Sequence, residues 1–168
     1  MNARDIVLAS LYASLYATTT IILGLALGPL VYGPIQIRLS DALLLTPIVH
    51  GVPAIMGLTI GCFIANAYVL GNPIDMVLGS IANLVAGYFV FKMRRRGPIF
   101  CSLIASLTIS LIVGSYLPLI IPEFLDAYGG LTLMAFAITY GGIFAGELIS
   151  TLVLGVPLIK AILNLRRQ

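Results

Sequence analysis

The sequence has few charged residues, no tryptophan, one histidine and two cysteines. Charged residues make up 9% of the 168 residues, whereas about a quarter are charged in a typical soluble domain. A chain this poor in charge cannot cover a soluble domain's surface in water, so its surface must contact lipid. One histidine and two distant cysteines, Cys62 and Cys101, cannot build a zinc site. We expect no metal and no cofactor.

Motifs for hydrolysing ATP or for nucleophilic catalysis are also absent. The only lysines follow Phe91 and Ile159, so no G-x-x-x-x-G-K-[ST] phosphate-binding loop exists. The single histidine, His50, lies at a predicted membrane boundary, which leaves no credible nucleophile–base pair. We therefore expect a protein that is not an enzyme. Energy for any uphill transport must come from a partner or from an ion gradient.

Apolar residues dominate what is present, at 60% of the chain and a mean hydropathy of +1.11. A membrane-spanning helix needs about 20 apolar residues. The predicted fold is an all-α integral membrane protein, with residues 1–168 forming one compact six-transmembrane-helix bundle. Its second stretch is short and contains Pro47, which favours a partial or tightly packed span. The six stretches are 6–27, 39–50, 52–70, 74–91, 99–121 and 131–163.

The distribution of charge predicts the orientation, because basic residues concentrate on the cytoplasmic side. With six spans and a cytoplasmic N-terminus, the inside segments hold Arg4, Lys92, Arg94, Arg95, Arg96, Lys160, Arg166 and Arg167. The outside loops hold Asp75, Glu123 and Asp126, with Arg38 as the one basic exception. We expect a multi-pass protein of the cell membrane with both termini cytoplasmic. We interpret the basic residues behind the net charge of +3 as orientation signals and contacts to lipid headgroups. We expect no nucleic-acid partner.

Glu147 is the strongest candidate for a functional residue. It lies near the middle of the sixth stretch, where a carboxylate costs about 2.5–3.5 kcal/mol. Such a residue usually faces a cavity, an ion or a ligand, and Tyr140 and Thr151 lie on the same helical face. The alternative is a structural carboxylate that is paired with Arg38 or held protonated.

Other polar residues permit both a binding and a structural interpretation. Asn66 and Asn83 could bind a purine-like edge or tie helices together. Asp75 follows Asn72-Pro73, so it fits a helix start as well as ligand contact. Arg38 lies beside Gln36, Ser40 and Asp41 and could belong to a polar site at the outer face. Tyr12, Tyr16, Tyr32, Tyr68, Tyr88 and Tyr116 are interpreted mostly as membrane-belt or packing residues.

A row of small residues marks one face of the first stretch. Ala9, Ala13 and Ala17 are spaced four apart, which makes a flat groove on one helix face. Small residues let membrane helices approach closely. The groove either packs inside the bundle or docks a partner membrane protein.

Three blocks of sequence resemble a known family. Residues 35–43 (IQIRLSDAL) resemble the pattern Q-x-R-x-S-E-A-L. Residues 61–66 (GCFIAN) and 74–82 (IDMVLGSIA) resemble the paired blocks G-C-x-x-A-N and D-x-V-x-G-S-x-A. Residues 146–148 and 154–158 (GEL and LGVPL) resemble its closing segment. In this order the blocks resemble the QueT family of queuosine-precursor transporters, the substrate-binding S components of energy-coupling-factor (ECF) transporters.

The resemblance implies a fold, a ligand and partners. It implies a six-helix bundle of the S-component type that binds a 7-deazaguanine and docks onto a transmembrane coupling subunit driven by two ATPase subunits. Ala9, Ala13 and Ala17 match the docking face of the family's first helix. Two departures, Asp41 for Glu and Asn83 for Thr, leave the particular base open.

The working hypothesis places the base in an outward-facing pocket under residues 28–36. Glu147 or Asp41 accepts hydrogen bonds from the ring N–H and the exocyclic amine. Asn66 or Asn83 contacts the carbonyl edge, and Asp75 or Asp41 binds a cationic aminomethyl group. The rival hypotheses are a stand-alone ion-coupled carrier or channel using Glu147, an S component for another vitamin-like solute, and a structural subunit without a ligand.

Overall fold

The computed structural model describes residues 2–32, 36–121, 130 and 132–165, and every regular element within them is helical. The predicted charge positions Glu123, Asp126, Arg166 and Arg167 lie outside the described residues. The elements are α1 (Ala3–Tyr32), η1 (Leu39–Leu45), α2 (Pro47–His50), α3 (Val52–Val69), α4 (Pro73–Met93), η2 (Arg94–Arg96), α5 (Pro98–Ile120), α7 (Leu133–Ile149), η3 (Ser150–Gly155) and α8 (Val156–Leu165).

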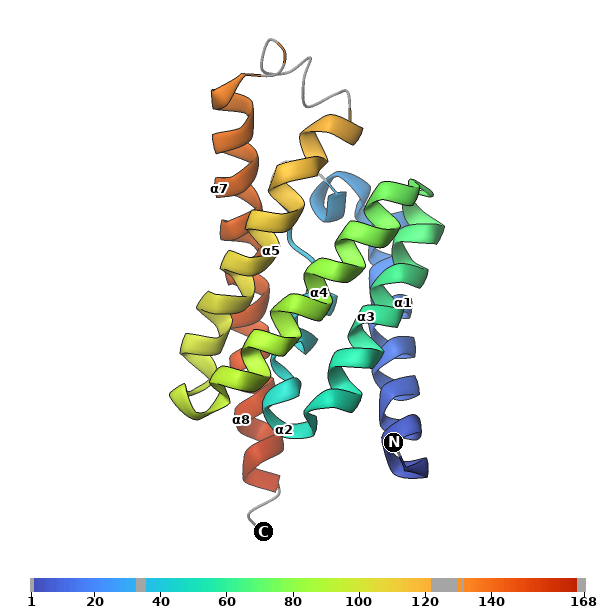
Figure 1. The fold of residues 1–168 in the computed structure, drawn as a ribbon, viewed down its shortest axis with the longest axis vertical. Coiled ribbons are helices and arrows are strands. Elements are labelled where there is room, and N and C mark those ends of the chain that lie inside the picture. Colours follow the sequence, from blue (N-terminus) through green and yellow to red (C-terminus); the bar gives the residue numbers. More distant parts are fainter. Residues whose placement is uncertain (1, 33–35, 122–129, 131, 166–168) are drawn as a thin grey trace.

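The all-helical prediction is confirmed, and five described helices are long and apolar enough to cross a membrane. They cover Ala3–Gly28, Val52–Val69, Pro73–Arg96, Pro98–Ile120 and Leu133–Leu165. The last is a continuous rod of α7, η3 and α8, in which η3 is a π-helical turn (Figure 1). The first predicted stretch, 6–27, ends one residue before the end of the first candidate span. The helix continues past Gly28 to Tyr32, with non-helical dihedrals only at Leu27 (φ −129°, ψ 23°).

Local sequence explains where the helices begin and end. Proline, which lacks a backbone N–H, occupies the first turn of α2, α3, α4 and α5. The Asn72 side chain caps α4 by accepting a hydrogen bond from the Ile74 amide at 2.9 Å. Gly51 and Gly97 separate consecutive helices with φ of 58° and 92°, a conformation that favours glycine.

The long helices pack in the order α1, α3, α4, α5, α7. Glycines allow the closest approach, between α1 and α3. A Cβ on Gly57 or Gly61 would collide with the backbone carbonyl oxygens of Ala9 and Ala13. The row of small residues on α1 therefore meets a second row on α3, as expected for helices that associate in lipid.

The predicted second stretch is a composite segment, residues 36–50, enclosed by the long helices. Residues 36–38 belong to no helix, Arg38 is extended (φ −102°, ψ 109°), and η1 and α2 follow. Leu44 and Leu45 are fully buried. The helical part spans about 20 Å at 2.0 Å per 3₁₀ residue and 1.5 Å per α residue. Three non-helical residues add up to about 10 Å, which brings the segment close to the bilayer's hydrocarbon thickness of about 30 Å.

Two glycines of the last rod make room for this segment. A Cβ on Gly146 would overlap the Gln36 carbonyl, and one on Gly155 would lie 2.8 Å from the Ala42 carbonyl oxygen. The π-helical turn of η3 lies between these glycines and packs on η1. Such turns occur mostly as single insertions in α-helices, frequently at functional sites.

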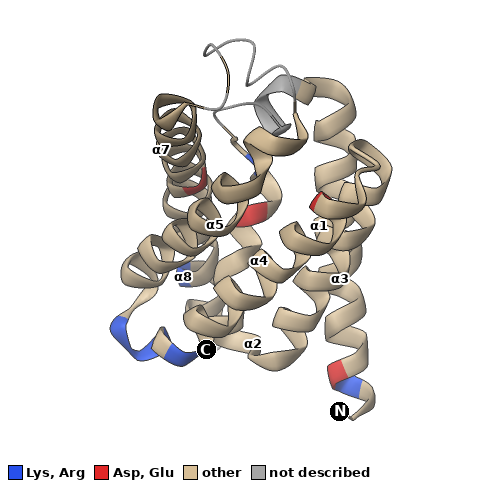
Figure 2. Cartoon of the chain, turned by 45° about the horizontal axis from the view of Figure 1, so that its top comes forward, with Lys and Arg blue, Asp and Glu red and all other residues tan. Residues whose placement is uncertain are grey.

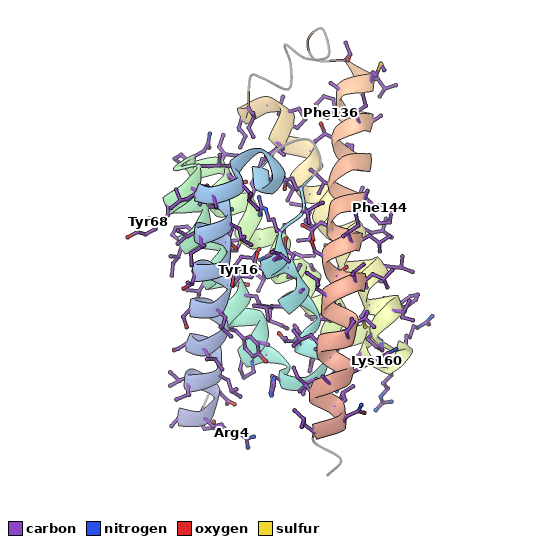
Figure 3. All side chains as sticks on the ribbon, turned by 180° about the vertical axis from the view of Figure 1, so that it is seen from behind. Arg4, Tyr16, Tyr68, Phe136, Phe144 and Lys160 are labelled. Carbon is purple, nitrogen blue, oxygen red and sulfur yellow. The ribbon has the colours of Figure 1, made fainter. Side chains whose placement is uncertain are left out.

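Both chain ends lie at the same end of the bundle. The start of α1, the helix α2, the α4–α5 turn and the end of α8 gather there in Figure 1. Figure 2 shows basic residues on the α4–α5 turn at this end, and Figure 3 places Arg4 and Lys160 toward it. The described basic residues that were predicted to lie inside therefore gather toward one end of the bundle.

Candidate functional site

A buried polar cluster begins where η1 meets α1. Asp41 is 1% exposed, and its Oδ1 accepts a hydrogen bond from the Tyr16 hydroxyl at 2.5 Å. One turn along α1, the Thr20 hydroxyl donates to the Ser40 Oγ at 2.7 Å. Figure 3 shows Tyr16 at mid-height in the bundle. The Q-x-R-x-S-D motif is therefore anchored to α1 deep inside the molecule.

Asp75 joins the cluster from α4. The predicted helix start at Asp75 is confirmed, because it lies in the first turn of α4. The charge count that placed Asp75 with the outside loops was wrong, because the residue is fully buried. Asn72 supplies the helix cap, which leaves the Asp75 side chain inside the bundle. Its Oδ1 accepts from the Tyr116 hydroxyl at 2.7 Å, and its backbone carbonyl accepts from Asn66 Nδ2 at 3.0 Å. Asn66 thus links α3 to the backbone of α4 at Asp75.

Glu147 approaches from α7 and is 1% exposed. It interacts electrostatically with Asp41 and Arg38, so the sixth predicted stretch and the composite segment converge on one place. Because the neighbouring residue is Gly146, the backbone of Gln36 lies directly against α7 here. On the next turn the Thr151 hydroxyl donates to the Glu147 carbonyl at 2.8 Å. That hydroxyl also shares hydrogen bonds with Ser102 (2.7 Å) and Ser106 (3.2 Å) of α5.

Cys62 and Arg38 connect the two halves of the cluster. Cys62 is within electrostatic range of Arg38, Asp41 and Asp75, and Tyr116 is within range of Arg38 and Cys62. The buried charged residues in the described ranges are three carboxyl groups and one guanidinium, those of Asp41, Asp75, Glu147 and Arg38. The interior is therefore rich in acidic groups, which favours a ligand with several N–H donors or a positive charge.

Several polar atoms in this cluster are buried without a hydrogen-bond partner. Within the described part of the chain they include Gln36 Nε2 and Oε1, Asp75 Oδ2, and both side-chain oxygens of Glu147. The carboxyl group of Glu147 lies next to that of Asp41, and two carboxylates that face each other cannot satisfy one another without a proton or a donor between them. An unsatisfied buried polar group costs about 1–3 kcal/mol. Native folds rarely leave five such atoms together. They are the donors and acceptors that a polar ligand would satisfy.

Two other predicted ligand contacts have packing roles in the structure. Asn83 is 3% exposed, and its Nδ2 lies 3.5 Å from the Leu58 carbonyl of α3, a long hydrogen bond between helices. The ring of Tyr140 is half-buried and lies where a Cβ on Gly114 of α5 would be. A ligand role for either residue stays a prediction.

The predicted docking row lies mostly inside the chain. Ala9 and Ala17 are 8% and 7% exposed and Ala13 is half-buried, because α1 packs on α3. An apolar groove of about 280 Å³ remains beside them, lined by Ile6, Ala9, Ser10, Ala13, Met56 and Ile60. Internal packing is therefore observed, and partner docking stays a prediction.

The sequence interpretation missed three members of the cluster. Tyr16 and Tyr116 were interpreted as belt or packing residues, yet their hydroxyls hold the two buried aspartates. Gln36 was noted only as a neighbour of Arg38. A detectable signal was its position in the Q-x-R-x-S block, because a glutamine at membrane depth needs partners as much as Asn66 does.

Comparison with known proteins gives a family match. A family model described as QueT transporter matches residues 6–164. Neither the search of curated proteins nor the search of solved structures finds a match. The matched range includes every residue of the buried cluster.

Proposed function

The chain belongs to the QueT transporter family, and from this premise we propose that it captures a queuosine precursor of the 7-deazaguanine class as the S component of an ECF importer. It is a transport protein with several apolar helices, and not an enzyme. The observation that carries the proposal is the set of five buried, unpartnered polar atoms on Gln36, Asp75 and Glu147.

The chemistry of these atoms fits a deazaguanine. The two oxygens of Glu147 suit the adjacent ring N–H and exocyclic amine, a charge-assisted bidentate pair. The Gln36 amide offers one donor and one acceptor, as the other polar edge of the base requires. Oδ2 of Asp75 suits a cationic aminomethyl group, with Tyr116 holding the other oxygen of that carboxylate in place.

The excess of carboxyl groups favours an amine-bearing base over a neutral one. The described interior holds three buried carboxyl groups and one buried guanidinium, so a cationic group would improve the charge balance. In a low-dielectric interior this balance matters more than in water. We propose the 7-aminomethyl form of the base as the preferred ligand.

Energy coupling would come from partner subunits, since the sequence has no phosphate-binding loop. The proposed contact for the transmembrane coupling subunit is the groove beside Ala9 and Ala13, because small residues let a partner helix approach closely. The composite segment 36–50 would form the sixth crossing. Both ends of the chain would then be cytoplasmic at the cell membrane, with the basic α4–α5 turn on the same side.

Equilibrium binding to purified protein tests the ligand. Calorimetry should show 7-aminomethyl-7-deazaguanine binding more tightly than guanine, and Glu147→Gln should weaken binding by about tenfold to a hundredfold, the loss of one charged hydrogen bond. Asp5→Asn is the matched control, because it removes the same kind of charge in the first turn of α1, outside the buried cluster. Unchanged affinity in Glu147→Gln would remove Glu147 from the site, and no binding of any deazaguanine would refute the ligand class.

A second experiment tests the docking surface. Ser10 is exposed and lines the groove, so Ser10→Trp should block a partner helix without disturbing the α1–α3 interface. Co-purification with the coupling subunit should fall, whereas Leu107→Trp on the exposed side of α5 should leave it intact. Ala13→Leu should act in the same direction. Transport into vesicles that contain this chain alone would instead favour the ion-coupled carrier.

A further inference from the structure

A cationic cavity lies at the turn between α4 and η2, away from the buried cluster. Its volume is about 400 Å³, and it is lined by Tyr88, Phe91, Lys92, Arg94 and Arg95. Lys92, Arg94 and Arg95 are all exposed. None of them forms an ion pair with a carboxylate in the described ranges, where Asp41, Asp75 and Glu147 are buried. The cavity therefore presents three positive charges to an anion outside the described residues.

Aromatic rings hold the cations in place around the cavity. The Lys92 Nζ lies 5.7 Å from the centroid of the Tyr88 ring, and the Arg94 Cζ lies 4.2 Å from that of Phe91. Arg94 Nη1 also donates to the Phe91 carbonyl at 2.9 Å. These cation–π contacts restrict the side chains and leave further N–H donors for a ligand.

An apolar groove begins where the cationic cavity ends. It also measures about 400 Å³, and its lining residues are Val52, Ile55, Met56, Leu84, Val85 and Tyr88. Tyr88 belongs to both cavities. Leu84, Tyr88 and Lys92 follow one another at intervals of about one turn along α4. The apolar groove therefore lies closer to the middle of α4 than the cations do.

We propose that these two cavities together bind one anionic glycerophospholipid, with its phosphate among Lys92, Arg94 and Arg95 and one acyl chain between α3 and α4. A phospholipid joins an anionic head to an apolar chain in the same order in which the two cavities follow each other. Tyr88, with an apolar ring and a polar hydroxyl, lies at the junction, where tyrosine is favoured at membrane interfaces. The proposal is independent of the solute site.

Native mass spectrometry of the purified full chain tests the proposal. The protein is mixed with equal amounts of phosphatidylglycerol and phosphatidylcholine that carry identical acyl chains. We expect one retained phosphatidylglycerol, and a loss of about fivefold in retention for each cation removed in Lys92→Gln and Arg95→Gln. Val85→Trp, which fills the apolar groove, should reduce retention while both cations remain.

Arg4→Gln and Lys160→Gln are the matched controls, because both cations are exposed at the same end of the bundle outside the two cavities (Figure 3). These variants should retain the lipid as the wild type does. An equal loss of lipid retention in the two control variants would indicate general attraction to basic surface residues and would overturn the proposal. Retention of phosphatidylcholine equal to that of phosphatidylglycerol would overturn it as well. Unchanged retention in Val85→Trp would refute the acyl-chain position. Thermal unfolding of each variant verifies that it is folded.

Discussion

Replacing Gly146 by alanine should damage the fold and the candidate site together. A Cβ at this position would lie 2.5 Å from the Gln36 carbonyl carbon and closer still to its oxygen, whereas ordinary contacts are 3.4–4 Å. The α7 backbone and residue 36 must therefore separate by at least about 0.9 Å. Overpacking costs about 1–3 kcal/mol. We expect a cost near the upper value, because the added Cβ meets backbone atoms, which cannot move aside as a flexible side chain can. Alanine has a higher helix propensity than glycine, which offsets up to about 1 kcal/mol of this cost.

The net loss of about 2 kcal/mol corresponds to a fall in Tm of about 4–8 °C. Differential scanning fluorimetry in detergent measures this fall. Calorimetry with the deazaguanine should show at least a tenfold weaker Kd, because Gln36 and Glu147 move apart. Gly141→Ala is the control, since nothing lies within 4 Å of its added Cβ and it should unfold at the same or a slightly higher temperature. An unchanged Tm and Kd for Gly146→Ala would refute the close passage of residue 36 against α7.

Three further substitutions test individual contacts. Tyr16→Phe removes the hydroxyl that donates to Asp41 and should lower stability by about 1.5–3 kcal/mol in thermal unfolding; a neutral result would place that hydroxyl outside the hydrogen-bond network. Thr151→Val removes the partner of Ser102 and should cost about 1–3 kcal/mol in the same assay, unless the π-helical turn repacks around the valine. Asp75→Asn keeps an acceptor for Tyr116 but loses its charge, so calorimetry should show a larger loss for the aminomethyl base than for guanine; equal losses would separate Asp75 from the amine.

Apolar stretches and the turn signals between them predicted the long central helices well, because lipid imposes strict demands on length and polarity. Stretches 52–70, 74–91 and 99–121 agree with α3, α4 and α5 to within two residues. The central segment was harder to predict. The twelve residues 39–50 suggested a partial or tightly packed span. The structure of this segment instead depends on glycines about a hundred residues later in the chain.

The site was predictable in its carboxylates and less so in their partners. Glu147 was expected from its cost in lipid alone, and Asn66 and Asp75 from polarity and sequence blocks. Tyr16 and Tyr116 resemble ordinary interfacial tyrosines in sequence, since only the fold shows that each hydroxyl meets a buried aspartate. Asn72-Pro73 predicted the helix start at Asp75 correctly, but the charge count grouped Asp75 with the outside loops, because no local feature reveals that α4 starts inside the bundle.

The enclosed segment 36–50 also constrains how the protein is made. It carries Arg38 and Asp41, each of which opposes entry of an isolated segment into lipid by about 2.5–3.5 kcal/mol. The helices that surround it, α3 to α8, are synthesised later. The nascent segment must therefore wait at the membrane surface, or in the translocon, until those helices have inserted and created a polar interior. Assembly of the candidate site is then among the last steps of biogenesis, and a chain that stops before α7 would lack Glu147.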